Sequence, residues 1–161
     1  MRKTFEAIAL GALAFLAWIT YSALYGPDPL PDRIPTHFNL AGQPDAWGSP
    51  SSLVLLPAVA MGLYVLITLA ALLPVSFKAP IRMTAENRAQ LEALTHRMLA
   101  WFKMCLVCLF TLIQWSILDG ARQGRFSLSP VMILVFLVAI FGGVGWYIAA
   151  MIRAGRPGSS S

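Results

Sequence analysis

The sequence predicts an all-α membrane protein, a four-transmembrane-helix bundle with a proline-rich extracytoplasmic loop between helices one and two. The first observation is composition: 58% of the 161 residues are hydrophobic and only 12% are charged, and the mean hydropathy is +0.69, far from the averages of soluble domains. The second is a set of four apolar runs, each close to the roughly 20 residues that cross a hydrocarbon core of about 30 Å. The third is the placement of Lys and Arg around those runs.

The expected spans are residues 5–25, 53–73, 99–118 and 131–152. Lipid offers the backbone no hydrogen-bond partners, so these runs must be helices, and the alternating segments of about 10 residues that build barrels are absent. A secretory signal would explain the first run, but this run has no small-x-small cleavage site and is interpreted as a retained helix. The spans form a single domain over residues 1–154, and residues 155–161 are expected to form a flexible tail.

The formal net charge is +5, and the distribution of its Lys and Arg residues along the chain predicts a membrane topology. With four crossings, nine of the twelve Lys and Arg residues lie on one side, and three lie on the other: Arg33, Arg122 and Arg125. Because cationic residues are retained on the cytoplasmic side, a multi-pass protein with both termini in the cytoplasm is predicted. No Lys/Arg tract has the interleaved aromatic residues that suit a nucleic acid, so the lipid bilayer is the expected partner.

Small residues mark one face on two of the expected helices. In the first helix, from about Thr4 to Tyr25, they are Ala7, Gly11 and Ala14. In the fourth, which Ser129 and Pro130 begin, they are Ala139, Gly142, Gly143, Gly145, Ala149 and Ala150. Small residues let membrane helices approach closely. We therefore expect these two faces to pack against each other.

The loop from Gly26 to Ser52 contains six prolines, which exclude a long helix. A period of two predicts a short strand in it, with one face toward the membrane-side core formed by Ile34, Thr36, Phe38 and Leu40. A turn at residues 41–44 would bring residues 45–48 back beside the strand, with Trp47 near Phe38. At 27 residues the loop is longer than a helix connection needs, which is typical of functional or disordered loops.

The second helix is expected from Leu53 to Leu73, followed by a short basic connection over residues 75–83. The third is expected over residues 85–118, with its first turns projecting past the bilayer. Gln114 is the most polar residue in any span and is expected to bond a neighbouring helix or lie near the outer surface. A proton-coupled exporter needs an ionisable residue at membrane depth. Glu6 and Lys103 fall near span boundaries, which disfavours that class.

The polar residues suited to chemistry gather in the loop: Asp28, Asp32, Arg33, His37, Asn39 and Asp45. His37 with Asp32 and Asp45 is an acceptable ligand set for a divalent cation. The spacing does not demand a metal, and side chains that close turns on backbone amides explain it better, so no metal or cofactor is expected. Since no nucleophile–base–orienter triad, phosphate-binding glycine loop or H-E-x-x-H helix occurs, an enzyme is not expected; the alternative is a loop metal site with a catalytic role.

One pattern in this segment is specific: L-P-x-x-I-P-x-H-F-N-x-x-G-x-P-D-x-W-G, formed by Leu30, Pro31, Ile34, Pro35, His37, Phe38, Asn39, Gly42, Pro44, Asp45, Trp47 and Gly48. It resembles the bacterial membrane family called domain of unknown function 1648, which also forms the front part of SdpI-type immunity proteins. The resemblance covers the first helix, the loop and the second helix, and it implies a bacterial cytoplasmic (inner) membrane.

The resemblance also implies a non-catalytic recognition or immunity-like module whose outward loop meets a peptide or toxin. Its candidate ligand-binding residues are then Pro35, His37, Asn39, Gly42, Asp45 and Trp47. The alternative is an accessory or structural subunit of a larger membrane complex, docked through the glycine and alanine helix faces, with candidate packing residues Gly11, Gly142, Gly143 and Gly145.

Overall fold

The computed structural model describes residues 1–73 and 84–155. Its elements in chain order are α1 (Arg2–Tyr25), β1 (Ile34–Phe38), β2 (Pro44–Gly48), a 3₁₀ turn (Pro50–Val54), α2 (Leu55–Leu72), α3 (Arg88–Gln123) and α4 (Pro130–Ala154). Within the described residues, four helices are long and apolar enough to cross a membrane, which confirms the predicted fold class. The expectations for residues 75–83 and for the tail beyond Gly155 lie outside the described residues.

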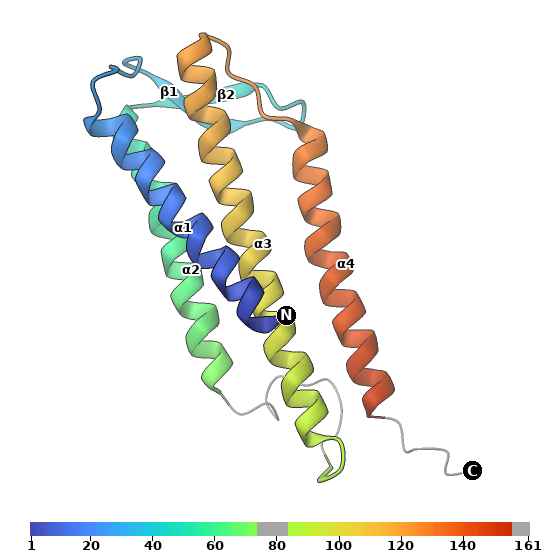
Figure 1. The fold of residues 1–161 in the computed structure, drawn as a ribbon. Helices are drawn as coiled ribbons and strands as arrows, with labels where there is room; N and C mark the ends of the chain where they lie inside the picture. The colour runs from blue at the N-terminus through green and yellow to red at the C-terminus, as the bar shows by residue number, and fades with distance from the viewer. Residues whose placement is uncertain (74–83, 156–161) are drawn as a thin grey trace.

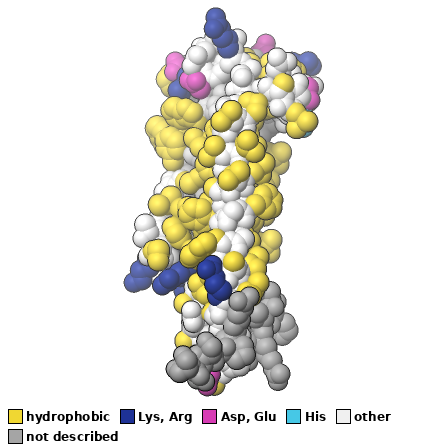
Figure 2. Space-filling model, turned by 90° about the vertical axis from the view of Figure 1, so that its right-hand side faces the viewer, with side chains coloured by type: hydrophobic (Ala, Val, Ile, Leu, Met, Phe, Trp, Pro, Cys, Tyr) yellow, Lys and Arg dark blue, Asp and Glu magenta, His cyan; other side chains and the backbone are white. Residues whose placement is uncertain are grey.

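Helix α3 is the centre of the bundle. The other three helices pack against it, α1 and α2 on one side and α4 on the other (Figure 1). The larger apolar core joins the halves of α1 and α3 nearer the hairpin to the start of α2, and it includes Leu16, Ile34, Leu53, Val107 and Ile117. A smaller core joins α3 to α4 through Leu91, Tyr147 and Met151. Away from these cores the helices present apolar side chains outward in a broad band, with charged side chains toward both ends (Figure 2).

The expected packing of α1 against α4 through their small residues is wrong. Helix α4 packs along α3, and a Cβ added to Gly143 would collide with the indole of Trp101. The indole nitrogen donates a hydrogen bond to the carbonyl of Ala139 over 3.2 Å. Around Gly11, Gly142 and Gly145, by contrast, no described atom lies within 4 Å of an added Cβ. Of the four candidate packing glycines, only Gly143 is thus shown to make room for a large side chain, the Trp101 indole of α3.

The long third helix is confirmed, with shifted ends. Residues 84–87 form a separate turn, in which the backbone nitrogens of Thr84 and Asn87 each donate to the other's side chain. Helix α3 then runs for 36 residues, about 54 Å at 1.5 Å per residue, which is longer than a bilayer core is thick. It ends at Gly124, whose φ of 67° closes the last turn. Helix α4 begins as expected, with the Ser129 side chain accepting from Met132 N at 3.3 Å and proline in the first turn.

The loop between α1 and α2 folds into the predicted two-stranded antiparallel hairpin, which lies across one end of the bundle (Figure 1). Register shifts on both sides of His37 interrupt the period of two. Ile34 is therefore buried as expected, whereas Thr36 and Leu40 are exposed. The expected approach of Trp47 to Phe38 is also wrong, because Phe38 pairs with Pro44.

Candidate functional site

The segment of residues 26–52, called the cap here, is closed by its own hydrogen bonds at the hairpin turn. The Asn39 carboxamide oxygen accepts from the backbone nitrogens of Ala41 at 2.9 Å and Gln43 at 3.1 Å. The backbone of Asn39 also pairs with Gln43 and Gly42. Side-chain amides often close turns in this way. Asn39 therefore builds the turn, which limits what its side chain can offer to a ligand.

Gly42 docks the hairpin turn on the connection between α3 and α4. Its φ is 74°, a conformation that glycine adopts at little cost. Its carbonyl accepts from Leu128 N at 2.9 Å, and a Cβ at this position would collide with the carbonyl oxygen of Leu128. The turn is thus held against a segment more than 80 residues further along the chain.

The remaining candidates divide by exposure. Pro35 lies within β1 and is fully buried. His37 and Asp45 reach toward each other across the strands, with 2.5 Å between Nδ1 and Oδ1, and their side chains are 68% and 43% exposed. Trp47 is half exposed and meets the ring of Phe126 edge-on at 5.3 Å between centroids. The exposed set, called the cap group below, is therefore His37, Asp45 and Trp47.

The proposed cation ligand set does not come together in full. Asp45 lies beside His37, but these two and Asp32 do not form a cluster. Within residues 1–73 and 84–155, no group of three or more His, Cys, Asp or Glu side chains is placed to hold a metal ion. The His37–Asp45 contact is explained by a charge-assisted hydrogen bond between two exposed side chains.

A buried polar cluster, the Gln114 cluster, joins α1, α3 and the 3₁₀ turn at Leu53, directly after the cap. Gln114 is fully buried, and its Nε2 donates to the Thr20 hydroxyl over 2.9 Å and to the Leu53 carbonyl over 3.1 Å. Thr20 in turn donates to the carbonyl of Leu16. The expectation that Gln114 bonds a neighbouring helix is thus confirmed. The sequence did not predict which residues Gln114 contacts. The signal that it offered was an isolated carboxamide in an apolar span.

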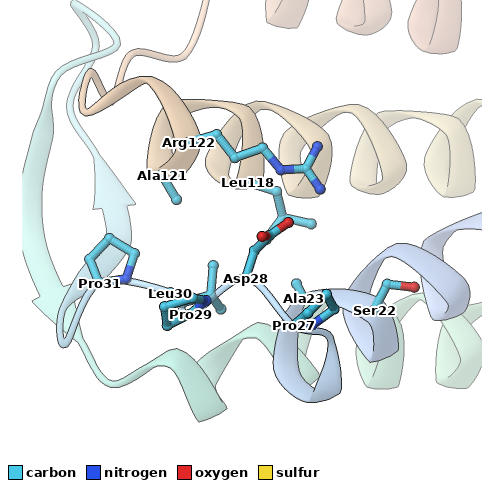
Figure 3. A pocket seen from close by; sticks show the side chains of 10 residues that line it. All are labelled: Ser22, Ala23, Pro27, Asp28, Pro29, Leu30, Pro31, Leu118, Ala121 and Arg122. Carbon is cyan, nitrogen blue, oxygen red and sulfur yellow. The ribbon is translucent and has the colours of Figure 1, made fainter.

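A small cavity lies at another corner of the cap, between the loop after α1 and the end of α3. Its volume is about 70 Å³, and it is lined by residues that include Asp28 and Arg122. Asp28 points from the loop toward α3, which carries Arg122 (Figure 3). Since a water molecule takes up about 30 Å³ of liquid, only one or two would fit. The space suits water around two charged groups better than a ligand.

A second buried polar cluster, the Lys103 cluster, lies between α1, α2 and α3 nearer the other end. The Lys103 ammonium is almost fully buried and lies 2.7 Å from Oε2 of Glu6. It also donates to the Thr68 hydroxyl at 2.9 Å and lies 4.1 Å above the ring centre of Tyr64, whose hydroxyl donates to Glu6. Sequence reasoning placed Glu6 and Lys103 near span boundaries but missed this ion pair, because the two residues are far apart in the chain.

Comparison with known proteins gives a match over a segment that contains the loop motif. Residues 11–61 match the model of the family described as "Domain of unknown function (DUF1648)". A relative from Archaeoglobus fulgidus, described as "Uncharacterized protein", is 42% identical over 52 residues, which are 32% of this chain and 25% of the relative. The chain thus spans about a quarter of the length of that relative. No solved structure matches.

Proposed function

We propose, from the premise that residues 11–61 form a domain of unknown function 1648, that this membrane protein is a non-catalytic recognition module whose cap binds a peptide or peptide toxin. One observation carries the proposal. Asn39 closes the hairpin turn, Gly42 docks the turn on the connection between α3 and α4, and Gln114 bonds Leu53 directly after the cap. The His37–Asp45 pair is exposed at its surface and takes part in none of those bonds.

A cap that is already folded favours binding. Ordering a flexible loop costs free energy at every association, whereas a cap closed by turn hydrogen bonds and docked at Gly42 has met that cost during folding. The cap group offers the exposed His37–Asp45 pair and, on the same strand as Asp45, a half-exposed indole. Aromatic side chains and charge-assisted hydrogen bonds contribute most to binding energy at protein interfaces.

We place the cap outside the cell, with both termini in the cytoplasm of a bacterial inner membrane. The support is the distribution of cations: only Arg33, Arg122 and Arg125 of the twelve Lys and Arg residues fall on the cap side of the predicted topology. Figure 2 shows charged side chains at both ends of the molecule with a hydrophobic band between them. In this orientation the cap group meets ligands that come from outside.

A display experiment tests the recognition function. The full chain in lipid nanodiscs is panned against a phage library of random dodecapeptides, and enriched peptides are measured by fluorescence anisotropy. We expect binding to weaken at least tenfold in His37→Ala and to stay unchanged in Asp32→Asn, since Asp32 is an exposed cap acid outside the pair. Enriched peptides that bind the wild type and His37→Ala equally, or a library that yields no enrichment, would contradict the proposal.

A second candidate, an accessory subunit of a larger membrane complex, is favoured by a separate observation. An open apolar groove of about 400 Å³ runs between the hairpin turn and α4, lined by residues that include Leu40, Ile133, Leu134 and Leu137. Leu40 is fully exposed and continues the apolar surface of the groove, and contiguous exposed apolar surface marks interaction sites. A transmembrane helix of a partner would cover this groove.

Site-specific photo-crosslinking in native membranes tests the accessory role. A benzophenone amino acid at position 134 of α4 is compared with one at position 69, an exposed leucine of α2 away from the groove. We expect one stoichiometric protein adduct from position 134 and none from position 69. Adducts with lipid alone at both positions would contradict it.

A further inference from the structure

A groove of about 190 Å³ lies along the seam between α1 and α3, in the half of the bundle nearer the cap. We call it the seam groove. The two helices run in the same direction (Figure 1), and the lining residues include Phe15 and Ser22 of α1 and Trp115 and Arg122 of α3. From Phe15 to Ser22, and from Trp115 to Arg122, the distance along the helix is about 10 Å at 1.5 Å per residue. The groove therefore has an aromatic end toward the middle of the bundle and a polar end toward the cap.

Three exposed aromatic rings form the apolar end of the seam groove. The ring of Phe15 stacks on that of Trp115 with 5.9 Å between centroids, and it lies 5.7 Å from that of Trp18. All three belong to helices that are apolar enough to cross a membrane. An engineered apolar cavity of about 150 Å³ takes up benzene, so a groove of about 190 Å³ takes a stretch of one acyl chain.

Two charges of opposite sign lie at the polar end. Asp119 and Arg122 both line the groove, three positions apart on α3, where side chains are neighbours on the helix surface. The three ion pairs among the described residues involve neither of them. The Asp119 carboxylate accepts from Gln123 through Oδ2 at 2.7 Å, which leaves Oδ1 as a further acceptor. The Arg122 side chain extends along α3 toward Leu118, away from the hairpin (Figure 3).

The geometry of α3 explains the arginine but not the acid. Arg122 lies in the last turn, where a cation is favourable beside the negative end of the helix dipole. A carboxylate near the same end is unfavourable for the same reason, and Asp119 is one turn away from it. Residues that break a local rule of this kind are expected at functional sites. A cation supplied by a ligand would compensate Asp119.

We propose that the seam groove binds a membrane phospholipid whose zwitterionic headgroup ends in a primary ammonium, as in phosphatidylethanolamine. The phosphate accepts from the Arg122 guanidinium, the ammonium donates to the Asp119 carboxylate, and one acyl chain follows the aromatic rings. Tryptophan is enriched where acyl chains meet headgroups, the level at which Trp18 and Trp115 would then lie. A quaternary ammonium has no N–H to donate, and an anionic headgroup would bring a second negative charge to Asp119.

The lipid site goes beyond peptide recognition and does not depend on it. None of the residues that line the seam groove belongs to the cap group. Charge complementarity at its polar end distinguishes this groove from the apolar groove beside α4, whose lining residues carry no formal charge.

Photo-crosslinking in phosphatidylcholine nanodiscs tests the proposal with the full chain. Three probes with the same diazirine-labelled acyl chain carry phosphatidylethanolamine, phosphatidylcholine or phosphatidylglycerol headgroups, each at the same low mole fraction, and adducts are mapped by peptide mass spectrometry. We expect phosphatidylethanolamine adducts to concentrate on residues 15–22 and 115–122. One charge-assisted hydrogen bond distinguishes the ammonium lipid, so its yield there should exceed that of the other two by roughly tenfold. Unlabelled phosphatidylethanolamine should compete.

Three surface substitutions complete the test. Asp119→Asn should lower the phosphatidylethanolamine adduct to the phosphatidylcholine level, and Arg122→Gln should lower it by a similar factor because the phosphate loses its donor. Arg125→Gln is the matched control, an exposed arginine at the same end that does not line the groove, and it should behave as the wild type. The comparison of the three probes on the wild type decides the outcome if a variant fails to fold.

Equal adducts from the phosphatidylethanolamine and phosphatidylcholine probes, or adducts spread over all four helices, would indicate ordinary bilayer lipid and overturn the inference. A preference for phosphatidylglycerol, or a preference for phosphatidylethanolamine that survives Asp119→Asn, would overturn it as well. The peptide-display experiment does not use the seam groove, so the lipid site and the recognition function can fail separately.

Discussion

The two buried polar clusters differ in how completely their polar groups are paired. In the Lys103 cluster, the ammonium faces a carboxylate, a hydroxyl and an aromatic ring. In the Gln114 cluster, about 16 Å further along α3 at 1.5 Å per residue, the nitrogen has two acceptors and the oxygen has no described partner. The polar groups of the Lys103 cluster are paired, whereas the fully buried Gln114 oxygen lacks a donor among the described residues.

The largest effect is expected from breaking the ion pair. Glu6→Gln leaves the Lys103 ammonium buried without a counter-charge, and removal of one partner from a buried pair costs about 3–5 kcal/mol. Unfolding by SDS in mixed micelles measures this loss. The double variant Glu6→Gln/Lys103→Met should recover part of the stability, because no buried charge then remains. Strictly additive losses in the double variant would show that the two residues do not act as a pair.

A smaller loss is expected at the docked hairpin turn. Gly42→Ala forces a side chain into a left-handed backbone and against the Leu128 carbonyl, and local backbone strain of this kind costs about 1–3 kcal/mol. Gly124→Ala is the matched control, since its φ is 67° but no described atom lies within 4 Å of the added Cβ. Hydrogen exchange at the Leu128 amide, which donates to Gly42, should increase only in Gly42→Ala. Equal exchange in both variants would mean that the turn is not docked there.

The loss of stability expected at the Gln114 cluster is comparable to that at the hairpin turn, or smaller. Gln114→Leu leaves the Leu53 carbonyl without its donor, and one unsatisfied buried group costs about 1–3 kcal/mol. The same change removes the unpaired oxygen, which offsets part of that cost. The SDS unfolding curve should therefore shift less than in Glu6→Gln. A larger shift would mean that the Gln114 cluster contributes more to the stability of the fold than the Lys103 cluster does.

The smallest effect on stability is expected at the exposed pair. His37→Ala removes a surface interaction, and such pairs contribute about 0–1 kcal/mol. Its unfolding curve should overlay that of the wild type while peptide binding is lost. A clear loss of stability would show that the pair holds the hairpin together, and the cap group would then be structural.

Sequence patterns were sufficient for the fold because each pattern is local. The four spans follow from runs of apolar residues, and the hairpin follows from proline, turn residues and a short alternation. Tertiary partners were harder to predict. Lipid is as apolar as leucine, so apolar side chains that face lipid look the same in sequence as those that face a helix. The small residues of α4 showed that something packs closely there, but not that Trp101 does.

The candidate site was predicted only in part, because the sequence does not separate residues that build the cap from residues exposed on it. The motif located the cap, yet residues that build a turn and residues exposed on it have the same polar character. Asn39 and Gly42 proved to hold the cap, while His37 and Asp45 are exposed. Gln114 and Leu53 are 61 residues apart, and nothing local in the sequence indicates that they meet.

Outward placement of the cap decides whether any recognition role is available to it, and labelling of intact cells measures that placement. In a background with Cys105→Ser and Cys108→Ser, a cysteine replaces the fully exposed Leu40 of the hairpin turn, or the exposed Ala85 before α3 at the other end. We predict that a membrane-impermeant maleimide labels position 40 in intact cells and position 85 only after lysis. Labelling of position 85 in intact cells, with position 40 protected until lysis, would contradict the orientation and remove the cap from its proposed role.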